Sequence, residues 1–263
     1  MKRNFEMWRV FFCLSSALIL ASAGAAQAQG RSDDERPGPS EDRLEEKVGD
    51  DLIKVTHIFR HNRGKAASAP CACADAGSAS YSLERVKWFD PSTSAVIYTV
   101  NSNVGSGAAA AVAASFGAWK TAGPASPSVA LSQNDVSPGP DIALDGEQAI
   151  SWRPLSSTYG ANTLAVTVYW YTLSRIGGYS KVVHFDIAFN TDYVWANSAA
   201  ADSCGGSGAF DIQNVGTHEA GHVLGLAHNR GCNLTMNPTA AEGETSKSTL
   251  APGDINGIKK IYP

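Results

Sequence analysis

The sequence has no apolar run long enough to span a membrane. Its most apolar stretch, from Val10 to about Ala21, is shorter than the roughly 18 residues that a membrane helix needs. A basic N-terminus precedes this stretch, and small residues ending in Ala26-Gln27-Ala28 follow it. This order is typical of a secretory signal peptide. We therefore predict that residues 1–28 are a signal peptide and that the chain is secreted, to the extracellular space or the periplasm, without a membrane span.

The sequence also lacks an excess of basic residues. Its 21 lysines and arginines are outnumbered by 25 aspartates and glutamates, which gives a net charge of −4 at pH 7. Loss of the signal peptide changes this charge to −6, because three positive charges and one negative charge leave with it. Proteins that bind nucleic acids carry a basic patch or stripe, and none is present here. We therefore expect no nucleic-acid partner.

Charged residues make up only 17% of the chain, whereas hydrophobic residues make up 43%. This balance suits one sizeable hydrophobic core. Residues 29–78 differ from the rest, because they are rich first in charged and then in small residues. We expect this segment to be a prosegment or a disordered tail without a core of its own. Ordered structure is then expected to begin near Tyr81, in a domain that spans residues 79–263.

The pattern of apolar residues predicts a series of strands and helices in this domain. The predicted strands are residues 86–89, 96–100, 142–144, 149–152, 164–171 and 182–189, and the predicted helices are 108–120, 211–224 and 252–262. In the last strand apolar residues alternate with His184 and Asp186, so we expect it at a sheet edge or in the wall of a cleft. This order of elements predicts a layered α/β or α+β domain.

One segment of the second predicted helix carries the chemistry, and it reads HEAGHVLGLAH from residue 218 to residue 228. His218 and His222 are four residues apart, so on a helix both imidazoles reach the same metal ion. Neutral imidazoles suit zinc, and three protein ligands leave a fourth position for water. Glu219 is placed to accept the proton of that water. The pattern therefore predicts a catalytic zinc site with Glu219 as general base.

Gly225 and His228 complete this motif. A glycine with positive φ can end the helix sharply and send the chain back toward the metal, where His228 arrives as the third ligand. The alternative is an amphipathic helix whose polar face carries histidines by coincidence. Motif and spacing together favour zinc binding.

The motif HExxHxxGxxH resembles the signature of the metzincin metallopeptidases. Met236, within Leu234-Thr235-Met236-Asn237-Pro238, is similar to the methionine turn beneath the zinc of that clan, and Pro238 indicates the matrixin-like branch. The resemblance covers about residues 80–263. It implies a metzincin-like α/β (α+β) fold with a twisted mixed sheet and about three helices, a cleft over the zinc, and Met236 and Gly225 as structural supports of the site. It also implies that a peptide substrate pairs with an edge strand.

The same resemblance bears on two further kinds of metal site, one for structural zinc and one for calcium. His184-Phe185-Asp186 is similar to a segment in which animal matrixins bind structural zinc and calcium, but the glycine-rich loops around it are missing, so we expect no structural zinc. Asp141, Asp145 and Asp186 offer oxygen ligands for calcium, and ordinary surface aspartates are the competing interpretation.

Cysteine is scarce, with five in the chain, of which Cys13 leaves with the signal peptide. Cys204 and Cys232 flank the motif helix and its turn, which suggests a disulfide between them. Free buried thiols, or pairing with Cys71 and Cys73, are the alternatives. Pro70 to Asp75 is only loosely similar to the thiolate segment that caps the zinc of latent matrixins.

The resulting hypothesis is a monomeric, secreted zinc endopeptidase that acts on protein or peptide substrates. The ligands are His218, His222 and His228, and Glu219 is the general base. The alternative from another class is a secreted zinc-containing protein-binding module without proteolytic activity.

Overall fold

The computed structural model describes residues 40–62, 80–89, 95–101, 107–134, 141–197, 208–231 and 234–263. All of them belong to one compact unit, Asp33–Pro263. The predicted signal peptide and the cysteines of the proposed disulfide lie outside the described residues. Within the described ranges no helix combines the length and the apolar character that crossing a membrane requires.

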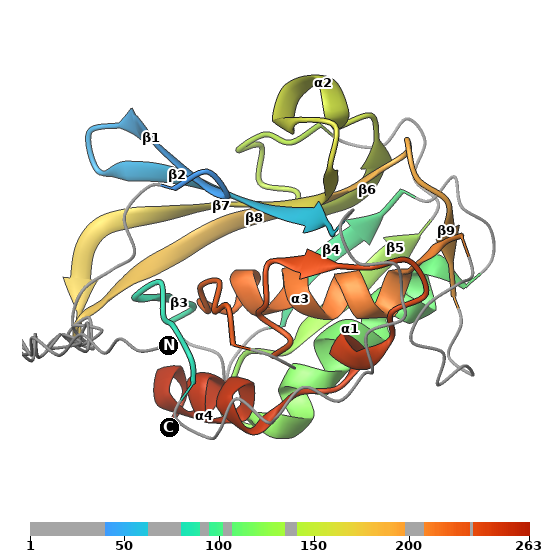
Figure 1. The fold of residues 1–263 in the computed structure, drawn as a ribbon. Helices are drawn as coiled ribbons and strands as arrows, with labels where there is room; N and C mark the ends of the chain where they lie inside the picture. Colours follow the sequence, from blue (N-terminus) through green and yellow to red (C-terminus); the bar gives the residue numbers. More distant parts are fainter. Residues whose placement is uncertain are drawn as a thin grey trace, which may run out of the picture. The chain divides into compact units, whose positions relative to one another are not determined.

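A mixed β-sheet forms one layer of this unit (Figure 1). Its main strands are β1 (Arg43–Gly49), β2 (Leu52–His61), β4 (Val96–Val100), β5 (Val129–Asn134), β6 (Ala149–Arg153), β7 (Thr163–Ile176) and β8 (Tyr179–Asn190). The spatial order is β1-β2-β7-β8-β6-β4-β5. The pairs from β1 to β8 are antiparallel, and the pairs among β8, β6, β4 and β5 are parallel.

Four short strands complete the described pairing. β3 (Val86–Lys87) pairs with β8, and β11 (Thr239–Ala240) pairs in parallel with the end of β2. β9 (Trp195–Ala196) and β10 (Phe210–Asp211) form a separate two-stranded sheet. The contact between β11 and β2 brings the chain after the zinc motif next to the N-terminal segment.

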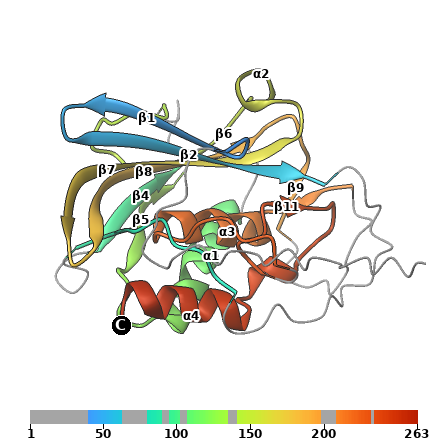
Figure 2. The same cartoon turned by 60° about the vertical axis from the view of Figure 1, so that its left-hand side comes forward.

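The helices α1 (Ala108–Ala122), α3 (Ile212–Val223) and α4 (Pro252–Ile261) lie on one side of the sheet, and the short α2 (Ser156–Tyr159) lies apart from them (Figures 1 and 2). α1 packs against α3 through Trp119, which is fully buried and donates its indole N–H to Thr217 O at 2.7 Å. This mixed α/β arrangement confirms the predicted fold class.

Two expectations about secondary structure are wrong, and so is one of the two alternatives of a third. Residues 40–62 contain two strands, so order begins well before Tyr81, because the alternating apolar residues of β2 have a sheet edge to pair with. Residues 142–144 are not a strand. β8 is an interior strand, so the sheet edge expected for it is wrong, while its place in the wall of a cleft stays a prediction. Asp186 is tolerated in the interior because it accepts hydrogen bonds from the backbone N–H groups of Ala143 (3.1 Å) and Ala149 (2.9 Å).

Candidate active site

The helix that carries the motif is buried along almost its whole length. α3 starts at Asp211, whose carboxylate accepts a hydrogen bond from the backbone N–H of Asn214 at 2.7 Å and caps the first turn. His218, Glu219 and His222 are each 0% exposed. Polar side chains buried this deeply need partners or a ligand.

A tight turn after α3 returns the chain toward the helix. Gly225 has φ +100°, its N–H donates to His222 O at 3.0 Å, and Leu226 N–H donates to Gly221 O at 3.0 Å, which together form a Schellman motif. A Cβ at Gly225 would lie 2.3 Å from Val86 O. The turn therefore requires glycine for its backbone angle and for the close approach of β3. It brings His228 back to the helix.

The three motif histidines meet at their Nε2 atoms. His218 Nε2 lies 3.1 Å from His222 Nε2 and 3.1 Å from His228 Nε2. His218 Nδ1 lies 2.7 Å from Thr235 O, and His222 Nδ1 lies 2.8 Å from Leu226 O. Because a carbonyl only accepts, each Nδ1 donates its proton and each Nε2 keeps a free lone pair. The arrangement presents converging lone pairs to one point.

Burial keeps these imidazoles neutral. It lowers the pKa of His218 to about 3, against the raising effect of its hydrogen bond to Thr235. It also lowers the pKa values of His222 and His228 well below the usual value, and the neighbouring histidines lower them further. Neutral imidazole is the form that binds a metal ion.

Glu219 stands beside the histidines with one oxygen held in place. Thr167 on β7 donates its hydroxyl to Glu219 Oε2 at 2.5 Å, while Oε1 has no hydrogen-bond partner among the described residues. Burial raises the pKa of Glu219 to about 8, although the bond from Thr167 lowers it. A fixed carboxylate with one free oxygen is suited to accept a proton.

Met236 lies under the helix and is 1% exposed. A Cβ at Gly221 would lie 2.3 Å from Met236 Sδ and 2.8 Å from Trp119 Cζ2, so this glycine allows the methionine to reach the helix backbone. Asp254 holds the turn of Met236, because it accepts hydrogen bonds from the N–H groups of Thr235 (2.8 Å) and Met236 (3.3 Å). Met236 therefore packs against the backbone of α3 at Gly221, between the two helical histidines in the sequence.

Sequence reasoning missed a fourth histidine at this centre. His57 on β2 stacks on His222, with ring centroids 3.8 Å apart and an angle of 7° between the rings. His57, His222 and His228 form a group whose potential ligand atoms lie within 4.8 Å of one another. The signal was present, because Ile53, Val55, His57 and Phe59 alternate in a run that has the composition of a strand.

The candidate calcium ligands have other partners. Asp186 accepts backbone hydrogen bonds, and Asp145 accepts one from Glu147 N–H at 2.9 Å. Asp141 pairs with Arg153 at 3.2 Å and is 89% exposed. Each of the three aspartates thus has a partner within the protein, and calcium binding stays a prediction.

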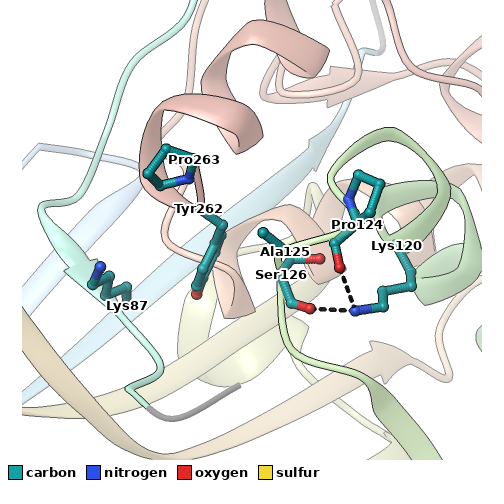
Figure 3. Close-up of a pocket in the computed structure, with 7 residues that line it drawn as sticks. All are labelled: Lys87, Lys120, Pro124, Ala125, Ser126, Tyr262 and Pro263. Carbon is teal, nitrogen blue, oxygen red and sulfur yellow. Dashed lines mark hydrogen bonds between the residues drawn. The ribbon is translucent and has the colours of Figure 1, made fainter. Parts of the chain in front are cut away.

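A separate pocket of about 390 Å³ lies beside the end of α4 and is lined by residues that include Lys87, Lys120 and Tyr262 (Figure 3). Lys120 Nζ donates to the carbonyls of Pro124 (2.8 Å) and Ser126 (2.5 Å). Its lining contains neither an acidic side chain nor a histidine, so we do not connect this pocket with the histidine centre.

Residues 174–263 match the matrixin family of peptidases. This segment, which includes the histidine motif, is matrixin-like. Over 74 residues it is 38% identical to metalloendoproteinase 1 of Glycine max, which covers 28% of this chain and 24% of that protein. Over 77 residues, 29% of this chain, it is 36% identical to neutrophil collagenase and 34% identical to matrilysin, both of Homo sapiens, covering 15% and 26% of those proteins. The matched segment thus spans about a quarter or less of these relatives.

Proposed function

We propose that the chain is a secreted zinc-dependent endopeptidase in which His218, His222 and His228 bind zinc and Glu219 is the general base. The observation that carries the proposal is the convergence of three histidine Nε2 atoms beside a buried Glu219. The matrixin-like domain supports the reaction class, because several relatives of that segment are named metalloendoproteinases.

The three histidines fit a zinc ion. Zinc–nitrogen distances are about 2.0–2.1 Å, so tetrahedral ligand atoms lie about 3.3 Å apart. The Nε2 separations of 3.1 Å are close to that value. The carbonyls of Thr235 and Leu226 orient His218 and His222 as outer partners of metal ligands do.

The chain's own groups have distinct tasks in peptide hydrolysis. Zinc, when bound, supplies Lewis-acid chemistry that acidifies water and polarises a carbonyl. Glu219 takes a proton from the attacking water through its free Oε1 and later gives it to the leaving amine. Thr167 holds the other carboxylate oxygen and so fixes the orientation of Glu219.

Metal content and hydrolysis of a denatured protein test this proposal. We expect about one zinc per chain, loss of zinc in His222→Ala, and retained zinc without hydrolysis in Glu219→Gln. Glu147→Gln is the matched control, because Glu147 is exposed and its change should alter neither property. Hydrolysis is measured on the full chain and after limited proteolysis of its N-terminal segment, with and without a chelator. Unchanged hydrolysis in Glu219→Gln would contradict the assigned role.

The alternative, a protein-binding module that keeps zinc as a scaffold, is favoured by one observation. His218, Glu219 and His222 are all inaccessible in this structure. That hypothesis predicts zinc-dependent binding of a protein without cleavage under any of these conditions, and Glu219→Gln would bind as well as the unchanged chain.

A further inference from the structure

Strand β2 is the second strand of the sheet and lies between the edge strand β1 and β7. It pairs antiparallel with β7 from Leu52 opposite Thr172 to Arg60 opposite Thr163. Among the described strands only β1 and β11 lie beyond it, so β7 would be an edge strand if β2 were absent. Exposed sheet edges are where extended peptides add as a further strand.

The end of β2 is hydrogen-bonded on its other side as well. Arg60 N–H donates to Pro238 O at 3.1 Å, and Asn62 N–H donates to Ala240 O at 2.8 Å. Residues 60–62 therefore run between the start of β7 and β11 as an extended segment with backbone partners on both sides (Figure 2). A peptide bound in a two-walled cleft would have the same contacts.

The side chains of β2 cover the histidine centre. His57 stacks on His222, and Phe59 stacks on His218 with ring centroids 4.0 Å apart. His57 lies opposite Thr167, the residue that holds Glu219. His57 is 1% exposed and Phe59 is 0% exposed. With both rings in place, Glu219 is 0% exposed to solvent.

An ionic contact attaches the hairpin to the turn after α3. Arg43 on β1 donates to both oxygens of Glu84, at 3.2, 3.1 and 2.9 Å, and His57 Nε2 lies 3.3 Å from Glu84 Oε1. Glu84 N–H in turn donates to Gly225 O at 2.9 Å. Burial lowers the pKa of His57, so the ring is neutral at pH 7 and the ion pair of Glu84 is with Arg43.

Other features of the hairpin are typical of a segment that can separate from the rest of the domain. Residues 44–49 of β1 are exposed, including Leu44 at 47% and Val48 at 42%. The buried Arg43–Glu84 pair specifies position more than it stabilises, because desolvation of both charges offsets their attraction. The catalytic helix, its turn and Met236 make their supporting contacts with β3, α1 and α4.

We propose that the hairpin of residues 40–62 occupies the peptide cleft of its own chain, with His57 and Phe59 closing the histidine centre, so that the full chain is latent until the hairpin leaves. The proposal rests on the proposed peptidase function. It differs from the thiolate cap to which residues 70–75 are loosely similar, since its blocking groups are an imidazole and a phenyl ring on a paired strand.

The test uses the full chain with Phe59→Asp, which places a charge against His218 and should displace β2. Leu44→Asp is the matched control, because it adds the same charge on the exposed face of the hairpin. We expect Phe59→Asp to hydrolyse denatured protein at least about tenfold faster than the unchanged chain. We also expect faster loss of zinc to a chelator and faster hydrogen exchange of β7 amides, and no change in Leu44→Asp.

A second variant tests the same proposal in case Phe59→Asp does not fold. His57→Ala removes one blocking ring without adding a charge, and it should give a smaller rise in chelator access and hydrolysis. A synthetic peptide of residues 50–62 should inhibit the opened enzyme competitively, and the same peptide with Phe59→Asp should inhibit at least about tenfold more weakly.

The outcomes separate the two proposals. If the chain binds no zinc, the proposed function fails. If zinc binds but the unchanged chain is as active and as accessible to the chelator as both variants, the hairpin is a fixed part of the domain and this inference is overturned. Glu219→Gln combined with Phe59→Asp should remain inactive while its zinc stays accessible.

Discussion

The helix α3 and the hairpin β1–β2 meet at the same centre, but they are held in different ways. α3 is fixed from several sides by a capping carboxylate, a Schellman turn and two glycines against which other groups pack. The hairpin is held by the pairing of β2 with β7, by a short contact with β11, by ion pairs such as Arg43–Glu84, and by buried side chains of β2 such as Val55 and Phe59. The difference indicates that α3 and the turn after it form a rigid platform. The hairpin of residues 40–62 forms a cover that can separate from this platform.

The largest effect is expected from Arg43→Ala, which breaks the hairpin's ionic contact. Glu84 would keep its charge in a buried position with only the neutral side chains of His57 and Tyr169 beside it, and breaking a buried pair in this way costs about 3–5 kcal/mol. If the hairpin is a separable cover, its amides and those of β7 should lose protection from hydrogen exchange, while α3 stays protected. Hydrogen exchange read by mass spectrometry distinguishes these regions.

Asp141→Ala is the control for this change. Asp141 pairs with Arg153 but is 89% exposed, and exposed pairs contribute about 0–1 kcal/mol. A uniform loss of protection in Arg43→Ala, with α3 as affected as β2, would show that cover and platform unfold together.

Gly225→Ala tests the platform instead of the cover. The new Cβ would face Val86 O at 2.3 Å in a backbone conformation with φ +100°, and we expect a loss of about 3 kcal/mol in the free energy of unfolding. The turn would shift, and zinc affinity should fall because His228 follows it. Chemical denaturation and metal titration measure the two effects.

Gly146→Ala provides the matched comparison, because Gly146 has φ +90° and a Cβ there would meet nothing within 4 Å. It should cost about 1–2 kcal/mol, from backbone strain alone, and leave zinc binding intact. Equal costs for the two substitutions would contradict the close contact with β3.

The platform could be predicted from the sequence because the residues that form it lie close together in the chain. His218, His222, Gly225 and His228 lie within eleven residues, and the helical period alone places the first two together. The contact of Met236 beneath the helix followed from resemblance. The interior place of β8 could not be predicted, since the backbone partners of Asp186 come from residues 143 and 149, far away in sequence.

The cover could not be predicted because the residues with which it pairs lie far away in the sequence. β2 finds its place by pairing with residues more than one hundred positions later, and Arg43 finds Glu84 across 41 positions. The acidic residues around β2 also masked its alternating apolar side chains, so the whole of residues 29–78 had the composition of a tail.

Among the variants that are not controls, the smallest effect is expected from Gly221→Ala, at the position where α3 packs closely against Met236. A Cβ there would lie 2.3 Å from Met236 Sδ, the end of a flexible side chain, and 2.8 Å from the rigid ring of Trp119. Gly221→Ala should cost about 1–3 kcal/mol, because overpacking outweighs the gain in helix propensity. Gly117→Ala in α1 has nothing within 4 Å and should be neutral or stabilising by up to about 1 kcal/mol. Thermal denaturation of both variants, with zinc and with a chelator, measures the difference. If Gly221→Ala is as harmless as Gly117→Ala, the methionine yields easily, and the platform is less rigid than its contacts indicate.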